Sequence, residues 1–481
     1  MIPHLELFVI QMFIIIFHKF YVKIGRINIF INIKNYIHLT TEERASKNRR
    51  ISETKRATVS RHLEMDCKTF DAKIQENSLN NQQKEALERI FLEQKWYKNF
   101  IINWSNQSDQ NKLSKFDTRQ TSITKKNKNM NDVEVQIQYL SAQSRQCLLS
   151  RMLANAKTIK TLSNKGLQKG GHLRFSKEET AIDLKQYGVS HKIVSNKRVK
   201  ITGIKKALVV NGLKQFIDIE GLEYANARLL RRPSGYYVQF VCYIPKELKQ
   251  YVKQTIGVDF GCETSFTLSN GEKLQASVQE SDRLKRLQRK LNKKTKGSKN
   301  WCKCKSQLNK EHERLTNKKN DLANKIVNKL CEYETVVIQD EQIAKWHKNG
   351  HGKKVQHSVL GRVKSKLKTK SNVVVLDKYV PTTKVCIECG CYHDELKIGD
   401  RTFKCDCGVE MDRDVHAAQN MVWFYENNVG VGRTEVKRVE MREKILNAIK
   451  HSKQTVSLNH EDSTLKGGIS SRLAVFCYIQ I

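Results

Sequence analysis

The segment Ile256-Gly257-Val258-Asp259-Phe260-Gly261 is the part of the sequence from which we infer the fold. We predict a strand over 255–260 that ends in Asp259-Phe260-Gly261. A second strand over 264–268 and the turn Asn270-Gly271 follow, which is a good β-hairpin signal. The first strand therefore carries one isolated carboxylate, Asp259, at its end.

Strands and helices alternate downstream of this hairpin, which predicts an α/β layer. Two long basic helices are expected over 281–330, split near Gly297-Ser298. The remaining predicted elements are buried strands over 335–338 and 373–376 and helices over 358–370 and 413–425.

Two more carboxylates accompany these elements. Glu341 follows the 335–338 strand, and Asp414 opens the helix after a group of cysteines. Phosphodiester cleavage by two metals needs three or four carboxylates around Mg²⁺ ions about 4 Å apart, and Mg²⁺ prefers oxygen ligands. An acid in the first turn of a helix can instead be only a cap, so these residues alone leave the site undecided.

The charge of the chain points to a polyanionic partner. The 481 residues include 87 Lys and Arg against 49 Asp and Glu, a net charge of +38. Releasing the counterions of a nucleic acid would drive binding, although a merely solvated basic surface is the alternative. Eight basic residues fall within 283–296, and we predict nucleic-acid contacts from Arg283, Arg286, Arg289, Lys290, Lys293 and Lys294.

Five of the 13 cysteines gather in one polar segment. Cys386-x-x-Cys389 and Cys405-x-Cys407 are separated by 15 residues, which predicts a structural zinc site with four thiolate ligands. Cys391 or His393 could replace one ligand, because the second pair has an unusual spacing. A run of buried free cysteines is the alternative in this polar segment.

The first half of the chain has a different texture. A strand is expected over 67–74 and amphipathic helices over 81–104 and 135–162, with a loop over 105–131 between the helices. Short β-like runs then occur at 191–194, 199–201, 207–210, 225–230 and 236–244. We therefore expect a helical insert inside a β-rich basic domain.

Residues 1–64 are expected to be a non-native or disordered extension, with Met65 a plausible true start. The apolar run 7–17 is too short to span a bilayer and lacks the features of a signal peptide. We expect no membrane association.

Residues of about 66–440 resemble TnpB, the RNA-guided nuclease family of bacterial and archaeal insertion sequences, which is related to Fanzor proteins and type V CRISPR effectors. The resemblance is carried by the motifs Ile256–Gly261, Arg286–Leu291 with Gly297–Asn300, Val336–Glu341, the paired cysteines, and Asp412-Arg413-Asp414 followed by Ala417–Asn420.

The resemblance implies an α/β fold with a RuvC-like RNase H nuclease core and a zinc-ribbon insert. A β-barrel-like wedge domain with an inserted helical recognition domain would precede this core. The expected divisions are an extension over 1–64, the wedge over 65–80 and 171–250, the recognition domain over 81–170, the nuclease over 251–383 and 409–440, the ribbon over 384–408 and a tail over 441–481.

The resemblance also implies Asp259, a glutamate after the second strand, and Asp414 as Mg²⁺ ligands, with Cys386, Cys389, Cys405 and Cys407 holding zinc. The usual glutamate position is Gln339 here, which supplies no charge. Glu341 would share a strand face with it at i+2, and we predict that Glu341 replaces it. His416 stands where the family has Asn.

The expected function is RNA-guided, metal-dependent cutting of DNA for a transposable element, with guide RNA and target DNA as partners. We expect the protein in the cytoplasm or nucleoid, or in the nucleus of a eukaryotic host. The element could also encode a separate serine recombinase. The alternatives are a guide-dependent DNA-binding protein that has lost cleavage, motivated by Gln339, and a decayed gene product. The oligomeric state stays open.

Overall fold

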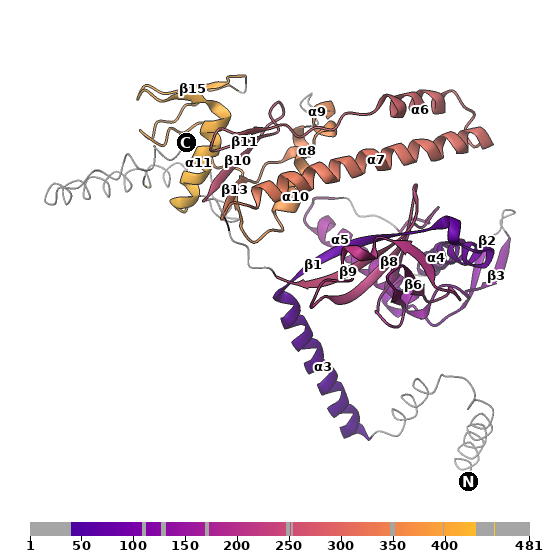
Figure 1. The fold of residues 1–481 in the computed structure, drawn as a ribbon. Coiled ribbons are helices and arrows are strands. Elements are labelled where there is room, and N and C mark those ends of the chain that lie inside the picture. Colours follow the sequence, from indigo (N-terminus) through magenta and orange to yellow (C-terminus); the bar gives the residue numbers. More distant parts are fainter. Residues whose placement is uncertain are drawn as a thin grey trace, which may run out of the picture. The chain divides into compact units, whose positions relative to one another are not determined.

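A computed structural model describes residues 40–107, 112–126, 131–168, 173–246, 251, 254–346, 352–397, 399–429 and 447. The chain divides into two compact units between residues 247 and 248, and each is described by itself (Figure 1). In these described ranges, no helix is long and apolar enough to cross a membrane.

The first unit begins with helix α3, Thr41–Leu63, which corrects the expectation of disorder for this part of the extension. Thr40 and Glu43 form a capping box that satisfies the free N–H groups at its start. None of its residues is buried. Its last turn is tied to the sheet of this unit by Arg61, whose guanidinium binds Glu223 at 2.7 Å.

A seven-stranded antiparallel sheet that nearly closes on itself follows. The strand order is β4-β8-β9-β1-β7-β6-β5. The strands are β1 Met65–Ile74, β4 Ala181–Leu184, β5 His191–Ser195, β6 Arg198–Ile201, β7 Leu208–Asn211, β8 Glu223–Arg232 and β9 Gly235–Pro245. The prediction missed β4, because a four-residue run with one charged member carries little periodicity.

Two helices of this unit, α4 Asn81–Asn106 and α5 Ala142–Asn164, were predicted to within a few residues at most ends. The expected loop over 105–131 is wrong in part, because β2 Ser122–Lys126 pairs with β3 Asp132–Gln136. Ile123 is the buried residue of the Ser-Ile-Thr-Lys-Lys strand, so its polar sequence concealed it. Short 3₁₀ turns complete the unit at Glu76–Ser78, Leu113–Lys115 and Leu213–Gln215.

The second unit contains a five-stranded sheet of order β12-β11-β10-β13-β14. The strands β10, β11 and β12 pair antiparallel, whereas β13 and β14 run parallel to β10. Their bounds are β10 Ile256–Phe260, β11 Phe266–Leu268, β12 Lys273–Leu274, β13 Val336–Gln339 and β14 Val373–Leu376.

Helices cover both faces of this sheet. Alternate residues Ile256, Val258 and Ile338 pack with α7, Lys299–Leu330, and α10, Leu360–Leu367. The opposite face carries Val337, which packs with Met421 of α11, Arg413–Glu426. The mixed α/β layer predicted from the sequence is therefore present.

The remaining elements project from this layer. Helix α6, Asp282–Asn292, pairs with the first half of α7 through Leu284, Leu287, Cys304 and Leu308. The break predicted near Gly297-Ser298 is confirmed, because Ser298 caps α7 and Gly297 has a φ of 89°. Short helices α8 Ile343–Trp346 and α9 Gly352–His357, and the hairpin β15 Thr402–Lys404 with β16 Glu410–Asp412, complete the unit.

Candidate active site and metal centre

The close approach of α11 to β10 places the first turn of the helix near the end of the strand. A Cβ added to Gly257 would lie 1.9 Å from the carbonyl oxygen of Ala418, so only glycine fits there. Asp259 lies two residues further along the strand on the same face, and Asp414 lies one turn before Ala418. The contact at Gly257 therefore brings these two carboxylates to the same end of the sheet.

The pKa of Asp259 is shifted by the neighbouring carboxylates. Burial, and then the charges of Asp414 and Glu341, raise the pKa of Asp259 to about 7. Asp414 and Glu341, the other two carboxylates predicted to hold Mg²⁺, are thus near enough to act on Asp259. They come from the end of β10, the turn after β13 and the start of α11.

The path by which Glu341 reaches this site differs from the one we predicted. Strand β13 ends at Gln339, and the N–H of Glu341 donates to the carbonyl of Gln339 at 2.8 Å, so the chain turns. The argument that 339 and 341 share a strand face is therefore wrong. Lys364 donates to the backbone carbonyl of Glu341, and burial raises the pKa of the Glu341 carboxyl.

The neighbouring residue Asp340 is paired with lysines. Its carboxylate binds the ammonium groups of Lys364 at 2.9 Å and Lys368 at 2.5 Å. Lys364 belongs to α10 and Lys368 is its C-cap, and hydrogen bonds from them lower the pKa of Asp340. Asp340 is therefore held by a basic pair, although its charge contributes to raising the pKa of Glu341.

Gln339 has become a buried structural residue. Val258 of β10 pairs with Ile338 of the parallel strand β13. The next residue of each strand, Asp259 and Gln339, would therefore lie side by side. The amide nitrogen of Gln339 donates to the carbonyls of Val380 at 2.6 Å and Asp377 at 3.2 Å, and its oxygen accepts from the Thr382 hydroxyl at 3.1 Å. The neutral amide therefore anchors the loop after β14.

Asp412 and Asp414 have separate roles at the start of α11. Asp412 is the N-cap, because its Oδ1 accepts the N–H groups of Asp414 at 3.0 Å and Val415 at 3.1 Å. Asp414 instead binds the guanidinium of Arg413 at 3.0 Å and lies 3.9 Å from that of Arg401. Asp412 therefore serves as the helix cap, whereas the Asp414 carboxylate is paired with arginines.

The donor chemistry of the three carboxylates fits Mg²⁺, which prefers oxygen. The raised pKa of Asp259 indicates negative charge that a cation would relieve. Within the described part of the chain, however, these side chains do not form a compact ligand group; only four cysteines do.

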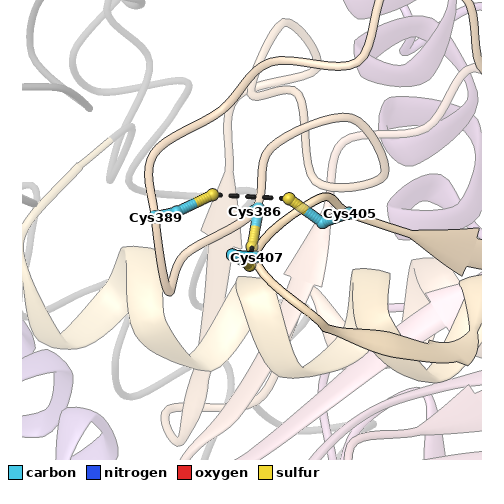
Figure 2. A group of neighbouring side chains, drawn as sticks. All are labelled: Cys386, Cys389, Cys405 and Cys407. Atoms are coloured by element: carbon cyan, nitrogen blue, oxygen red, sulfur yellow. Dashed lines mark hydrogen bonds between the residues drawn. The ribbon is translucent and has the colours of Figure 1, made fainter.

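Those four cysteines form a site that fits zinc. The ligand atoms of Cys386, Cys389, Cys405 and Cys407 all lie within 4.8 Å of one another. Figure 2 shows the sulfurs turned toward one centre, with Cys386 3.6 Å from Cys407 and Cys389 3.4 Å from Cys405. Tetrahedral bonds of about 2.3 Å to zinc would separate the sulfurs by roughly 3.8 Å.

Backbone turns present the thiols in pairs. Gly390 donates to the carbonyl of Cys386 at 2.8 Å, and Gly408 to that of Cys405 at 2.9 Å, each with positive φ. The Cys-x-Cys spacing therefore still forms a tight metal-binding turn. Although burial opposes it, hydrogen bonds from the Cys391 backbone and the Cys405 thiol lower the pKa of Cys389 to about 6. Burial instead raises the pKa of Cys386 to about 11 and raises that of Cys405, so Cys389 is the member of these three that favours the thiolate.

Neither alternative ligand joins this cluster. Cys391 is exposed, and although its thiol interacts with those of Cys389 and Cys405, it is not one of the four clustered ligands. His393 turns its Nδ1 to Glu395 at 2.9 Å and packs edge-on against Phe403. The ligand set expected from the resemblance is therefore the one that the structure brings together.

The cysteine hairpin is joined to α11 by contacts that the sequence did not reveal. Phe403 of β15 stacks on His416 with ring centroids 3.7 Å apart. Arg401 accepts the Arg413 N–H at its carbonyl, and its guanidinium binds Glu263 at 2.6 Å. In the sequence, the only indication of these contacts was that His416 stands where the family has Asn.

The basic residues predicted on the first long helix lie on α6 or just after it. Leu284 and Leu287 face α7, which leaves the charged side chains on the solvent side. Arg283 and Arg314 share the buried Glu311, at 3.1 and 2.7 Å. Of the predicted contacts, Arg283, Arg286, Arg289, Lys290 and Lys293 are exposed and Lys294 is half-buried.

Two family models match the second unit and the strand before it. The model described as "Probable transposase" matches residues 239–349, which include Asp259 and Glu341. The model described as "Cas12f1-like, TNB domain" matches 359–421, which include the four cysteines and Asp414.

Curated relatives agree with these models. The chain is 31% identical over 214 residues to a "Putative RNA-guided DNA endonuclease" of Streptomyces pristinaespiralis, covering 42% of this chain and 53% of that protein. It is 27% identical over 196 residues to the "Putative RNA-guided DNA endonuclease InsQ" of Escherichia coli (strain K12), covering 35% and 48%. The matches span about half the length of each relative.

Proposed function

Since the chain belongs to the TnpB family, we propose that it is an RNA-guided DNA endonuclease of a transposable element. The observation that carries this proposal is the raised pKa of Asp259, caused by burial and by the charges of Asp414 and Glu341. Carboxylates crowded at the end of a sheet are costly unless a cation or a proton neutralises them.

The fold is consistent with this proposal. A sheet of three antiparallel strands followed by two parallel ones, covered by helices on both faces, is the arrangement expected of a RuvC-like RNase H core. We further propose that the nearly closed sheet of the first unit is the wedge domain, and that α4 and α5 belong to the helical recognition domain.

Asp259, Glu341 and Asp414 would hold two Mg²⁺ ions. The ions supply an activated water and stabilise the departing oxygen when they are bound. To act as ligands, Asp259 would have to be ionised and the Asp414 carboxylate would have to turn from the arginines. The guanidinium groups of Arg401 and Arg413 beside Asp414 would also suit phosphate, which a planar guanidinium binds well.

The nucleic acids would be held by charge. Guide RNA and target DNA are the proposed partners, and the exposed basic side chains of α6 suit the phosphate backbone of either. A separate serine recombinase, if the element encodes one, would perform strand transfer. Zinc would act structurally by fixing the cysteine hairpin next to α11.

The test is cleavage of a matched target by the purified ribonucleoprotein with Mg²⁺. Asp259→Asn and Glu341→Ala should each lower cleavage by more than the ~100-fold that loss of an outer partner costs a metal site. Gln339→Ala is the matched comparison. This variant should still cleave DNA, although it loses the hydrogen bonds that hold the loop over 377–382. If Gln339→Ala abolishes cutting and Glu341→Ala does not, the assignment of Glu341 is wrong.

A guide-dependent DNA-binding protein without cleavage is the second candidate. It is favoured by the neutral Gln339 beside Asp259 and by the two arginines at Asp414. Guide-dependent binding of matched DNA with no product at any Mg²⁺ concentration would establish it and refute the nuclease.

A further inference from the structure

The loop over 377–382 leaves the sheet at the same edge as the proposed active site. Strand β14 runs parallel to β13, and Leu376 pairs with Gln339. Because parallel strands end at a common edge, the residues after Leu376 emerge beside Glu341 and near the end of β10. The loop is therefore placed next to the carboxylates.

Buried amides hold this loop in one conformation. Gln339 makes three hydrogen bonds to it, and Asn420 of α11 donates to the carbonyl of Thr382 at 2.7 Å. Within the loop, the N–H of Tyr379 donates to the carboxylate of Asp377 at 2.8 Å. Gln339 is 4% exposed and Asn420 is fully buried, so these anchors are shielded from water.

The tip of this fixed loop presents an aromatic ring. Tyr379 is 52% exposed, and the ammonium of Lys378 lies 4.5 Å from the centre of its ring. Among the described residues of the second unit, Tyr251 is the other strongly exposed large apolar side chain, and nothing comparable anchors it. A single exposed aromatic is ordinary; one held rigidly beside a cleavage site is not.

We propose that Lys378 and Tyr379 form a stacking platform for a nucleobase of the DNA strand that is being cut. This inference rests on the proposed nuclease function and names how its substrate is held. A base would lie against the open part of the Tyr379 ring, since base–aromatic stacking tolerates any sequence. The Lys378 ammonium against this ring would add positive charge that attracts the adjoining phosphate.

The charge around the loop favours nucleic acid over an apolar partner. Lys378 belongs to the platform itself, whereas the ammonium groups of Lys364 and Lys368 are paired with Asp340 at the turn after β13. An apolar protein partner needs a contiguous patch, whereas the described surface offers one ring with the Lys378 ammonium against it. Gln339, which stands where the family usually has a glutamate, would thus serve to hold the loop that carries the platform.

The experiment uses full-length protein with the Asp259→Asn substitution and its guide RNA. DNA targets carry 2-aminopurine at successive positions around the cut site, since stacking quenches its fluorescence. We expect quenching at one or two positions. Tyr379→Ala should remove that quenching and weaken binding of short single-stranded DNA by about 5- to 150-fold, whereas Tyr379→Phe should preserve both.

Tyr251→Ala is the matched control for the loss of an exposed tyrosine, and it should behave like the parent protein. Unchanged quenching and affinity in Tyr379→Ala would overturn the platform, even if the parent sequence with Asp259 cuts DNA. A different result is quenching that depends on Tyr379, together with no cleavage by the parent protein that retains Asp259. That result would refute the nuclease proposal but support the stacking platform.

Discussion

Phe403 of the cysteine hairpin stacks on His416 of α11, with ring centroids 3.7 Å apart and planes inclined by 13°. His416 is two residues from Asp414, and Phe403 is two residues from Cys405. Burial, and to a lesser degree His393, lower the pKa of His416 to about 4, so the ring is neutral at pH 7. The stack is therefore a direct contact between the zinc hairpin and the proposed active-site helix.

Removing this stack should destabilise the second unit. An aromatic pair contributes about 0.5–1.5 kcal/mol beyond its buried area, so Phe403→Leu should lose at least that in a denaturant melt. His416→Phe should be better tolerated, because it keeps the stack and removes Nδ1, which has no hydrogen-bond partner among the described residues.

Thr402→Ala is the control for Phe403→Leu, because Thr402 is an exposed neighbour in the same strand. Equal melting of Phe403→Leu and Thr402→Ala would show that the stack contributes nothing.

Gly257→Ala should damage the packing of α11 on β10. The new Cβ would lie 1.9 Å from a backbone oxygen, which has no flexible end to move aside. We expect a loss of several kcal/mol, above the ~1–3 kcal/mol typical of overpacking. Gly361→Ala is the control, since nothing lies within 4 Å of its Cβ in α10 and alanine favours a helix there. Thermal melting should show a lowered stability for Gly257→Ala and not for Gly361→Ala.

Asp259 should make the stability of Mg²⁺-free protein depend on pH. Its pKa is raised to about 7 in the folded state from an ordinary value of 3.8. The folded state therefore holds a proton that the unfolded state releases, and the contribution to stability is complete below pH 3.8 and is lost as pH rises through 7. Asp259→Asn should flatten the profile between pH 5 and 8 in urea melts.

Mg²⁺ should reverse this trend, because it binds the deprotonated carboxylate. Its stabilising effect should therefore grow from pH 6 to 8. If Asp259→Asn and the parent protein respond identically to both pH and Mg²⁺, the carboxylate group described above is not a metal site.

Zinc content should depend on the four clustered cysteines and not on their neighbour. We expect one zinc per chain by elemental analysis, lost in Cys386→Ser or Cys407→Ser. Cys391→Ser is the matched control, since this cysteine lies in the same segment but outside the cluster. Loss of zinc from Cys391→Ser would show that the ligand set is wrong.

The exposed face of α6 should bind phosphates. Arg286→Ala and Arg289→Ala should each weaken nucleic-acid binding and reduce the slope of log affinity against log salt by about 0.7–0.9. Lys325→Ala removes a cation of α7 that already pairs with Asp321 at 2.9 Å, and it should change the slope less. Equal slopes in all three variants would exclude α6 from the interface.

The sequence was informative where one residue type serves one purpose. The Cys-x-x-Cys and Cys-x-Cys pairs predicted the four-cysteine cluster that the structure contains, because few other patterns in a polar segment explain four cysteines. The strands and helices around Asp259 followed from apolar periodicity and turn residues. The strand β2 and the helix α3 were missed, because polar sequences there carry little periodicity.

The sequence by itself therefore determined the α/β class and the cysteine cluster, since these depend on residue type and local spacing, whereas Asp259 and Asp414 were proposed as ligands from the family resemblance. Only the tertiary structure decided how the elements meet. Gly257 lets α11 approach β10, Phe403 stacks on His416, and Gln339 turns from an expected ligand position into the anchor of the 377–382 loop. These are contacts between residues far apart in the chain, and no local pattern encodes them.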